Sequence, residues 1–301
     1  MKQIEGKVAF VTGAANGAGF GMAQVFSKNG MKVVIADIRQ DSLDRAMAFF
    51  GNNPNVHAIR LDVTDREAFV RAADETERLF GKVHILCNNA GINLFVPIED
   101  CTYNDYDWVM GVNFGGVVNG IQTFLPRIRK HGEGGHIVNT ASMGAFLPSA
   151  AAGIYTASKF GVLGLSAVLR YSLYKYNIAV SVFCPGLINS VIYESEKVRP
   201  ARFASPQNTA KSQEFMDILP KIHQAGMSPE EVGQKVLAGI RRNDFYIFSH
   251  PEFKEELKEI FDEVLDALPE GEAPADRLAF EKTRRDGLKK AREEANKIGH
   301  D

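Results

Sequence analysis

Short apolar runs alternate with longer polar segments along most of the chain. Each run is rich in the apolar residues typical of strands, and the runs lie at 8–11, 33–36, 56–61, 83–87, 136–140, 179–184 and 245–248. Continuous apolar strands are typical of a parallel sheet that helices cover on both faces. The alternation therefore predicts an α/β fold, a single doubly wound, Rossmann-like domain.

Helix signals occupy segments between these runs. Residues 65–80 and 154–176 are predicted to be helical, and Ser228 before Pro229 indicates a helix that begins with a serine cap. No stretch rich in Ser, Pro or Gly divides the chain into separate parts. Residues 1–250 are therefore predicted to form one domain.

Two regions depart from a minimal α/β domain. Residues 187–226 form a connection much longer than an ordinary loop, which makes them a candidate lid. Residues 251–301 are predicted to form a helical C-terminal extension. Its first part has apolar residues on one helical face, at 253, 257, 260, 261, 264, 265 and 268, which suggests packing against this chain or a partner subunit. Its last part, 276–297, is predicted to be a solvated, charged helix.

Composition narrows the possible functions. The chain is 45% hydrophobic and 24% charged, with a formal net charge of -2, so it offers no basic surface for nucleic acid or an acidic membrane. No apolar signal region precedes the first strand, and no run approaches the ~18 apolar residues of a spanning helix. We therefore expect a cytoplasmic protein that acts on small molecules. Cys87, Cys101 and Cys184 show no metal-binding spacing and are expected to be free thiols, with no metal site.

A glycine-rich loop at residues 12–19 follows the first strand and opens a helix. Its glycines would let the backbone approach a pyrophosphate, whose charge the helix N-terminus favours. Asp37 ends the second strand, near the spacing expected for a carboxylate that binds ribose. The glycine pattern is not GxGxxG, so the prediction of a dinucleotide site depends on the loop, the helix and Asp37 together.

Tyr155 and Lys159 lie one helical turn apart, and Ser142 precedes them just after the fifth apolar run. Side chains at i and i+4 share a helix face, so the Lys159 ammonium should stabilise the Tyr155 phenolate and lower the pKa of the phenol. Tyr155 would then act as general base for an alcohol or general acid for a ketone. Ser142 could donate a hydrogen bond to the substrate oxygen as charge develops on it.

These motifs, with the segment 88–91, Asn113 and the pair Pro185-Gly186, resemble the short-chain dehydrogenase/reductase family in their order along the chain. The resemblance implies a seven-stranded parallel sheet, a nicotinamide cofactor and hydride transfer to or from a carbinol carbon. It also implies that Asn113 holds a water that links Lys159 to solvent, which adds Asn113 to the candidate catalytic residues.

Asp37 indicates NAD as the cofactor, because its carboxylate would bind the ribose hydroxyls and repel the 2'-phosphate of NADP. Arg39 is expected to flank the adenine or to lie in solvent. The resemblance places the following residues around NAD: Gly13, Asn16, Gly17, Ala18, Gly19, Asp37, Asp62, Val63, Asn89, Ala90, Gly91, Tyr155, Lys159, Pro185, Gly186, Ile188 and Ser190.

The loops beyond the carboxyl ends of the strands are mostly apolar and aromatic, with a few cations, which predicts a bulky aromatic secondary alcohol as substrate. The candidate contacts are Asn93, Phe95, Phe146, Tyr193, Arg199 and His223. Segments 19–21, 105–108, 199–201 and 222–224 resemble the NAD-dependent Cα-dehydrogenases that oxidise the benzylic alcohol of lignin-derived β-aryl ethers.

Three functions are compatible with these residues. The first is NAD-dependent oxidation of such an alcohol to a ketone. The second is NAD(P)H-dependent reduction of another bulky ketone, steroid-like or polyketide-like, and the third is dinucleotide sensing without catalysis. The preference for NAD favours oxidation, and the intact set of Ser142, Tyr155, Lys159 and Asn113 argues against a sensor. The resemblance also implies a homodimer or homotetramer.

Overall fold

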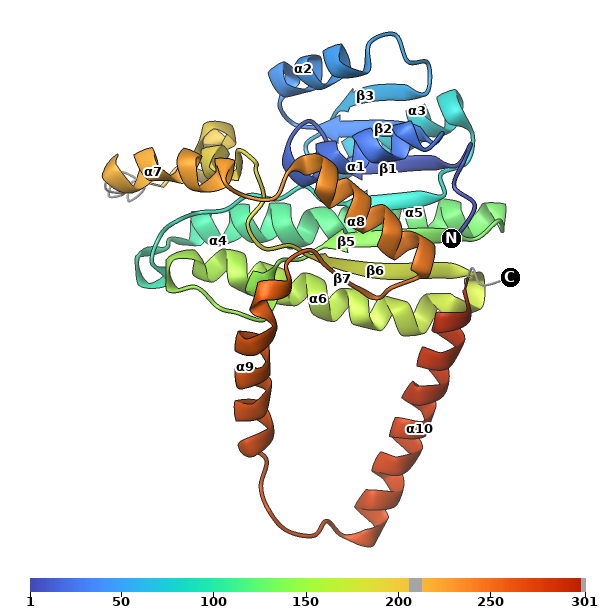
Figure 1. The fold of residues 1–301 in the computed structure, drawn as a ribbon, viewed down its shortest axis with the longest axis vertical. Coiled ribbons are helices and arrows are strands. Elements are labelled where there is room, and N and C mark those ends of the chain that lie inside the picture. The colour runs from blue at the N-terminus through green and yellow to red at the C-terminus, as the bar shows by residue number, and fades with distance from the viewer. Residues whose placement is uncertain (206–212, 299–301) are drawn as a thin grey trace.

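The computed structural model describes residues 1–205 and 213–298 of the chain (Figure 1). Within these ranges, seven parallel strands form one sheet in the order β3-β2-β1-β4-β5-β6-β7. The strands are β1 Val8–Thr12, β2 Lys32–Asp37, β3 Val56–Arg60, β4 Ile85–Asn88, β5 Gly135–Thr140, β6 Ile178–Cys184 and β7 Tyr246–Phe248. Each overlaps one predicted run, so the predicted seven-stranded parallel sheet is confirmed.

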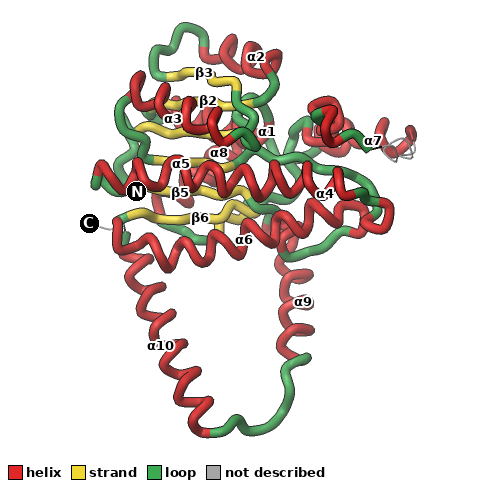
Figure 2. The backbone as a smooth tube through the Cα atoms, turned by 180° about the vertical axis from the view of Figure 1, so that it is seen from behind, coloured by secondary structure: helices red, strands yellow, loops and turns green. Residues whose placement is uncertain are grey.

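Helices cover both faces of this sheet (Figures 1 and 2). They are α1 Gly17–Lys28, α2 Gln40–Phe50, α3 Arg66–Phe80, α4 Tyr103–Met110, α5 Gly116–His131, α6 Gly153–Leu173, α7 Gln213–Gln224, α8 Pro229–Arg242, α9 Lys254–Asp266 and α10 Ala275–Lys297. One buried cluster joins α1, α2 and α8 to the sheet, and a second joins α3, α5 and α6 to it. The predicted doubly wound arrangement, with a helical C-terminal extension, is therefore confirmed.

The strand order explains where a ligand can bind. The chain runs outward from β1 through β2 to β3, then returns to β4 on the other side of β1 and continues outward to β7. Successive connections diverge at the boundary between β1 and β4, and this divergence opens a crevice at the carboxyl ends of the strands. The glycine-rich loop after β1 and the loop after β4 meet at this point.

Helices α1 and α8 contact each other backbone to backbone. A Cβ atom on Gly21 would lie 1.6 Å from the Pro229 carbonyl oxygen, and one on Gly233 would lie 2.1 Å from the Gly21 carbonyl oxygen. The predicted cap is also present, because Ser228 and Glu231 form a capping box at the start of α8. Glycine at positions 21 and 233 therefore allows α8 to pack closely against α1.

The predicted lid contains regular structure. It includes two 3₁₀ segments, η6 Ile192–Val198 and η7 Ala201–Phe203, followed by α7, while residues 206–212 lie outside the described residues. Figure 1 shows α7 extending away from the sheet. The connection is long because it builds a substructure over the carboxyl edge.

The C-terminal extension projects from the body as an open pair of helices, α9 and α10 (Figure 1). The first part of the predicted apolar face packs on the body, through Phe253, Leu257 and Phe261. Val264, Leu265 and Leu268 are exposed on α9. The far end of α10 returns to the body, where Asn243 Nδ2 donates to the carbonyl oxygens of Ala295 and Ile298 at 2.8 and 3.1 Å.

One helical stretch, Ala150–Tyr176, is long and apolar enough to cross a membrane by length and composition, which the count of apolar runs did not suggest. This stretch consists mainly of α6. Val162 and Leu173 of α6 are buried against the sheet, and the core helix of a globular domain meets the same criterion. The stretch is therefore explained by its place in the sheet's helical cover.

Candidate active site

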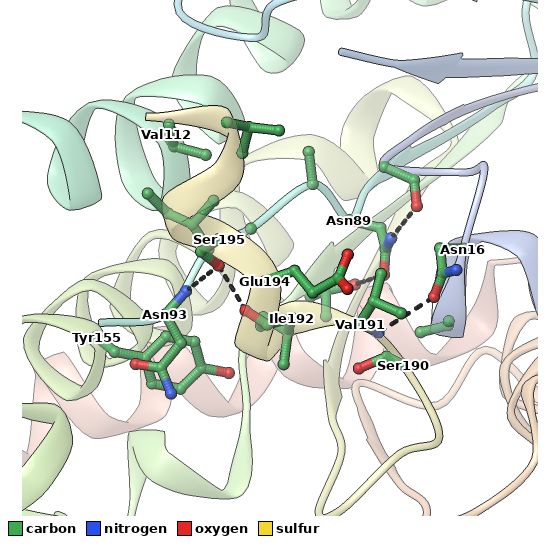
Figure 3. Close-up of a pocket in the computed structure, with 18 of the residues that line it drawn as sticks. Asn16, Asn89, Asn93, Val112, Tyr155, Ser190, Val191, Ile192, Glu194 and Ser195 are labelled. Atoms are coloured by element: carbon green, nitrogen blue, oxygen red, sulfur yellow. Dashed lines mark hydrogen bonds between the residues drawn. The ribbon is translucent and has the colours of Figure 1, made fainter. Parts of the chain in front are cut away.

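A cavity of about 500 Å³ lies at the carboxyl edge of the sheet, where the strand order reverses (Figure 3). The loops after β1, β2, β3, β4, β5 and β6 all contribute to its wall, and so do residues of the predicted lid. Its polar groups fall into two sets. One set surrounds the glycine-rich loop and Asp37, and the other consists of Ser142, Tyr155 and Lys159.

The glycine-rich loop has glycines at positions where a side chain would collide with neighbouring residues. Gly13 and Gly17 have φ angles of +61° and +51°, a region that favours glycine. A Cβ on Gly13 would lie 2.8 Å from Ala90 Cα, and one on Gly17 would lie 2.7 Å from Ser190 Cβ. Gly19 does not line the cavity. A Cβ on Gly19 would lie 2.3 Å from the Gly13 carbonyl oxygen. Its role is close packing beneath the loop.

Asp37 is held at the end of β2 by two backbone groups. Its Oδ2 accepts a hydrogen bond from the Ala15 N–H at 3.2 Å, and its Oδ1 accepts one from the Arg39 N–H at 3.0 Å. Burial raises the pKa of this carboxyl, and the hydrogen bonds oppose that rise. Asp37 therefore braces the glycine-rich loop while its carboxylate lines the cavity.

Asn89 joins the loop after β4 to the glycine-rich loop. Its Nδ2 donates to the carbonyl oxygens of Thr12 and Gly13 at 3.0 and 3.2 Å, and its Oδ1 accepts from Thr140 Oγ1 at 3.2 Å. Thr12 Oγ1 accepts from the N–H groups of Asn89 and Ala90. Thr12 and Thr140 were missed in the sequence as site residues, although both end strands that reach this edge.

Ser142, Tyr155 and Lys159 line the inner part of the cavity. Lys159 Nζ donates to the Thr140 carbonyl oxygen at 2.9 Å and lies 5.4 Å from the centroid of the Tyr155 ring. Helical spacing on α6 places both residues toward the end of β5, where Ser142 follows the strand. The structure therefore brings the three predicted residues together.

The electrostatics differ from the sequence expectation. Burial lowers the pKa of Lys159 to about 8 and raises the pKa of Tyr155, while a hydrogen bond with Ser142 opposes the rise for Tyr155. Lys159, with an oxidised nicotinamide adding to its effect, was expected to lower the pKa of Tyr155, and in the chain without cofactor this pKa is instead raised. Loss of water around the phenol is the larger effect, and further positive charge beside the ring would be needed to reverse it.

Asn113 lies in a π-helical turn, Gly111–Gly115, between α4 and α5. Its Oδ1 accepts from the Ile92 N–H at 2.8 Å, and its Nδ2 donates to the Ile92 carbonyl oxygen and to Ser158 Oγ, both at 3.0 Å. Asn113 is fully buried and does not line the cavity. Gly91 lies next to both Asn113 and Lys159: a Cβ on Gly91 would be 3.4 Å from Asn113 Oδ1 and 3.4 Å from Lys159 Nζ.

The remaining residues predicted to bind the cofactor are gathered along one side of the cavity. They come from the loops after β3, β4 and β6, and Asn16 Oδ1 accepts a hydrogen bond from the Val191 N–H at 3.3 Å. All the predicted cofactor residues except Gly19 line the cavity: Gly13, Asn16, Gly17, Ala18, Asp37, Asp62, Val63, Asn89, Ala90, Gly91, Tyr155, Lys159, Pro185, Gly186, Ile188 and Ser190.

The predicted substrate residues separate into two groups. Asn93, Phe95 and His223 line the cavity, and the side chains of Asn93 and Tyr155 are drawn there in Figure 3. The Asn93 amide oxygen is buried and has no hydrogen-bond partner among the described residues. Tyr193 does not line the cavity, but its ring lies 5.3 Å from the His223 ring.

Phe146 and Arg199 were predicted to contact substrate, and the structure places both elsewhere. Phe146 packs against Tyr246, Phe248 and Phe261, on the side of the sheet that faces the C-terminal extension. Arg199 forms a buried ion pair with Asp105. Aromatic packing and charge pairing decided these positions; Arg199 also pairs with nearby Glu196, but its buried partner Asp105 is distant in the sequence.

Two lid residues were missed in the sequence. Ser195 Oγ accepts a hydrogen bond from the Asn93 N–H at 3.0 Å and donates one to the Ile192 carbonyl oxygen at 2.6 Å (Figure 3). Glu194 forms an ion pair with Arg39, Nη1 to Oε2, at 2.8 Å. In the charged stretch 194–197, nothing in the sequence distinguished a side chain that lines the cavity from one that lies in solvent.

Comparisons with known proteins agree with this geometry. The model of the short chain dehydrogenase family matches residues 7–199. The chain is 43% identical over 270 residues to a C alpha-dehydrogenase from Sphingobium sp. (strain NBRC 103272 / SYK-6), covering 89% of this chain and 88% of that protein.

Two solved structures are also similar. The apo form of LigO from Sphingobium sp. strain SYK-6 is 41% identical, with a TM-score of 0.77. The match covers 95% of this chain and 97% of the LigO chain. A short-chain dehydrogenase/reductase from Burkholderia phymatum, solved in complex with NAD, is 31% identical, with a TM-score of 0.84. The match covers 91% of this chain and 100% of the Burkholderia chain. This chain belongs to the short-chain dehydrogenase family.

Proposed function

We propose that this protein is an NAD-dependent dehydrogenase that oxidises the secondary, benzylic alcohol of a bulky aromatic substrate to a ketone. The observation that carries the proposal is one continuous cavity with a glycine-rich cradle and Asp37 in one part and Ser142, Tyr155 and Lys159 in another. Such a cavity can hold a dinucleotide with its reactive end beside groups that move a proton.

NAD fits the residues present. The glycine-rich loop lines the cavity, Gly13 and Gly17 hold backbone conformations that favour glycine, and the loop leads into the N-terminus of α1, which favours a pyrophosphate. Asp37 is placed to accept hydrogen bonds from the adenosine ribose. Ile188 and Ser190 also line the cavity, with Ser190 against Gly17 of the loop, and are proposed to hold the carboxamide end. Bound NAD supplies the hydride acceptor and a positive charge beside Tyr155.

The chain's own residues supply the proton chemistry. Tyr155 accepts the proton of the substrate hydroxyl as general base, and the deprotonated phenol is stabilised by Lys159 and by the hydrogen bond with Ser142. Ser142 has a single hydroxyl proton, and as Tyr155 becomes protonated Ser142 donates it to the developing alkoxide instead. Asn113 fixes the loop at Ile92 against α6, and we propose that it holds the water path from Lys159 to solvent.

The proposed substrate class rests on the side chains that line the cavity. Apolar and aromatic side chains line much of the cavity, among them Phe95, Trp108, Met143, Ile192 and Phe253. Asn93 and His223 add polar groups that could bind substituents on an aromatic ring. The 43% identity to a C alpha-dehydrogenase supports a benzylic carbinol in particular.

A panel of matched secondary alcohols tests this proposal. Benzylic, steroidal and aliphatic alcohols are each incubated with NAD and with NADP, and the reduced cofactor is measured, with the corresponding ketones and NADH run in parallel. We expect the fastest turnover for a benzylic alcohol bearing a β-aryl ether, with NAD. Faster turnover of a steroidal or aliphatic alcohol would contradict the substrate class, and no turnover across the panel would favour a non-catalytic sensor.

We also propose a cytoplasmic homodimer or homotetramer. Association is supported by exposed apolar side chains, Phe160 and Val168 of α6 and Phe261 and Val264 of α9. Light scattering on the purified full chain should give twice or four times the 33.2 kDa mass of one chain. A monomer would contradict this proposal without affecting the proposed chemistry.

A further inference from the structure

Arg39 follows Asp37 at the end of β2 and pairs with two carboxylates. Its Nη1 lies 2.8 Å from Glu194 Oε2, and its Nη2 lies 3.1 Å from Asp41 Oδ2. The Arg39 and Glu194 side chains are 24% and 22% exposed, and both line the cavity. The guanidinium therefore sits at the edge of the cavity with its donors already engaged.

Glu194 reaches this position from the lid. It lies in η6, far from β2 in the sequence, and Figure 3 shows its carboxylate extending from η6 toward the side of the cavity that holds Asn16 and Asn89. Its second oxygen, Oε1, accepts from Lys197 Nζ at 2.7 Å. Charge pairing with Lys197 and Arg39 lowers the pKa of Glu194, so the carboxylate is ionised at neutral pH.

Arg39 would otherwise weaken the selection that Asp37 makes. An arginine beside this ribose position is suited to a 2'-phosphate, because its planar fork of donors matches phosphate oxygens. Arg39 is two residues beyond Asp37, and its N–H donates to Asp37 Oδ1. A free guanidinium there could bind the phosphate that the Asp37 carboxylate repels, so Asp37 by itself does not fix the choice of cofactor.

We propose that Glu194 is a second determinant of cofactor choice: it pairs with Nη1 of Arg39 and so withholds this nitrogen from the 2'-phosphate of NADP, while the exposed Asp41 pairs with Nε and Nη2. NADP binding would have to break this pair before the guanidinium could reach the 2'-phosphate. NAD carries no phosphate there and leaves the pair intact. The pair also ties the lid to the part of the cavity that binds the adenosine ribose. This inference rests on the proposed NAD-dependent function.

The test uses Glu194→Gln, which keeps the shape of the side chain and removes its charge. Binding of NADH and NADPH is titrated by cofactor fluorescence on the full chain without any alcohol. We expect NADPH affinity to rise about tenfold and NADH affinity to change less than about threefold. Glu230→Gln is the matched control, because Glu230 pairs with Lys28 outside the cavity, and the affinity ratio should not change.

A second pair of variants separates release of Arg39 from simple charge repulsion. In an Arg39→Ala background, adding Glu194→Gln should leave NADPH affinity unchanged, because no guanidinium remains to be released. An equal gain in this background, or an unchanged ratio in Glu194→Gln alone, would overturn the proposal. Failure of the alcohol chemistry would be visible separately, as normal NADH binding without NAD reduction.

Discussion

Arg199 Nη2 lies 2.8 Å from Asp105 Oδ1, and the two side chains are only 8% and 1% exposed although 94 positions separate them in the sequence. Asp105 belongs to the capping box that begins α4 with Thr102. The Arg199 guanidinium also lies 4.3 Å from the centroid of the Trp108 ring. This pair fastens the lid to α4, beside the cavity.

Removal of Arg199 should therefore destabilise the protein. Arg199→Met leaves the Asp105 carboxylate buried without its cation, and we expect the free energy of unfolding to fall by about 3 kcal/mol. Urea denaturation measures the change. Lys258→Met removes the exposed ion pair with Asp262 on α9 and should cost less than about 1 kcal/mol. An equal, small cost for both variants would contradict the structural role assigned to Arg199.

The contact between α1 and α8 makes a second prediction. Gly21→Ala would place a Cβ against the Pro229 carbonyl, where no side chain can move aside, so we expect a loss of at least about 2 kcal/mol or failure to fold. Gly287→Ala is the matched control, because nothing lies within 4 Å of a Cβ there and it is inside α10. Removal of that helical glycine should stabilise by about 0.5 kcal/mol. An unchanged melting temperature for Gly21→Ala would refute the close contact.

Burial of Lys159 predicts a pH dependence of stability. The pKa of Lys159 falls from its ordinary 10.5 to about 8 in the folded chain. Between these pH values the unfolded chain binds more protons at this site, so the free energy of unfolding contributed by Lys159 rises with pH. The difference between wild type and Lys159→Met should therefore increase by roughly 3 kcal/mol across this window. Denaturation curves of the cofactor-free proteins measure it, and a flat or falling difference would contradict the burial.

The sequence predicted the sheet and many of the residues that line the cavity around the glycine-rich loop, because those features are local. Buried parallel strands appear as continuous apolar runs, and a glycine-rich loop between a strand and a helix has its chemistry within a few residues, as does Asp37 at the end of β2. Tyr155 and Lys159 share a helix face by spacing alone. The order of these local features along the chain then defined one site.

The lid could not be predicted in the same way, because its side chains depend on distant partners. Arg199 was expected at the substrate and instead pairs with Asp105, while Phe146 packs toward α9. Glu194 gave no signal, since its ion pair with Arg39 joins residues 155 positions apart. A charged side chain in a long connection has many possible partners, and only the folded arrangement selects one.

The transfer of hydrogen from the carbinol carbon tests the central claim most directly. A benzylic secondary alcohol carrying deuterium on its carbinol carbon is oxidised with NAD, and mass spectrometry of the cofactor and the ketone follows the label. We predict one deuterium in each NADH and an equal amount of ketone for the wild type, and turnover reduced at least about 100-fold in Tyr155→Phe, which still binds NADH. Unlabelled NADH, or full activity of Tyr155→Phe, would contradict the account.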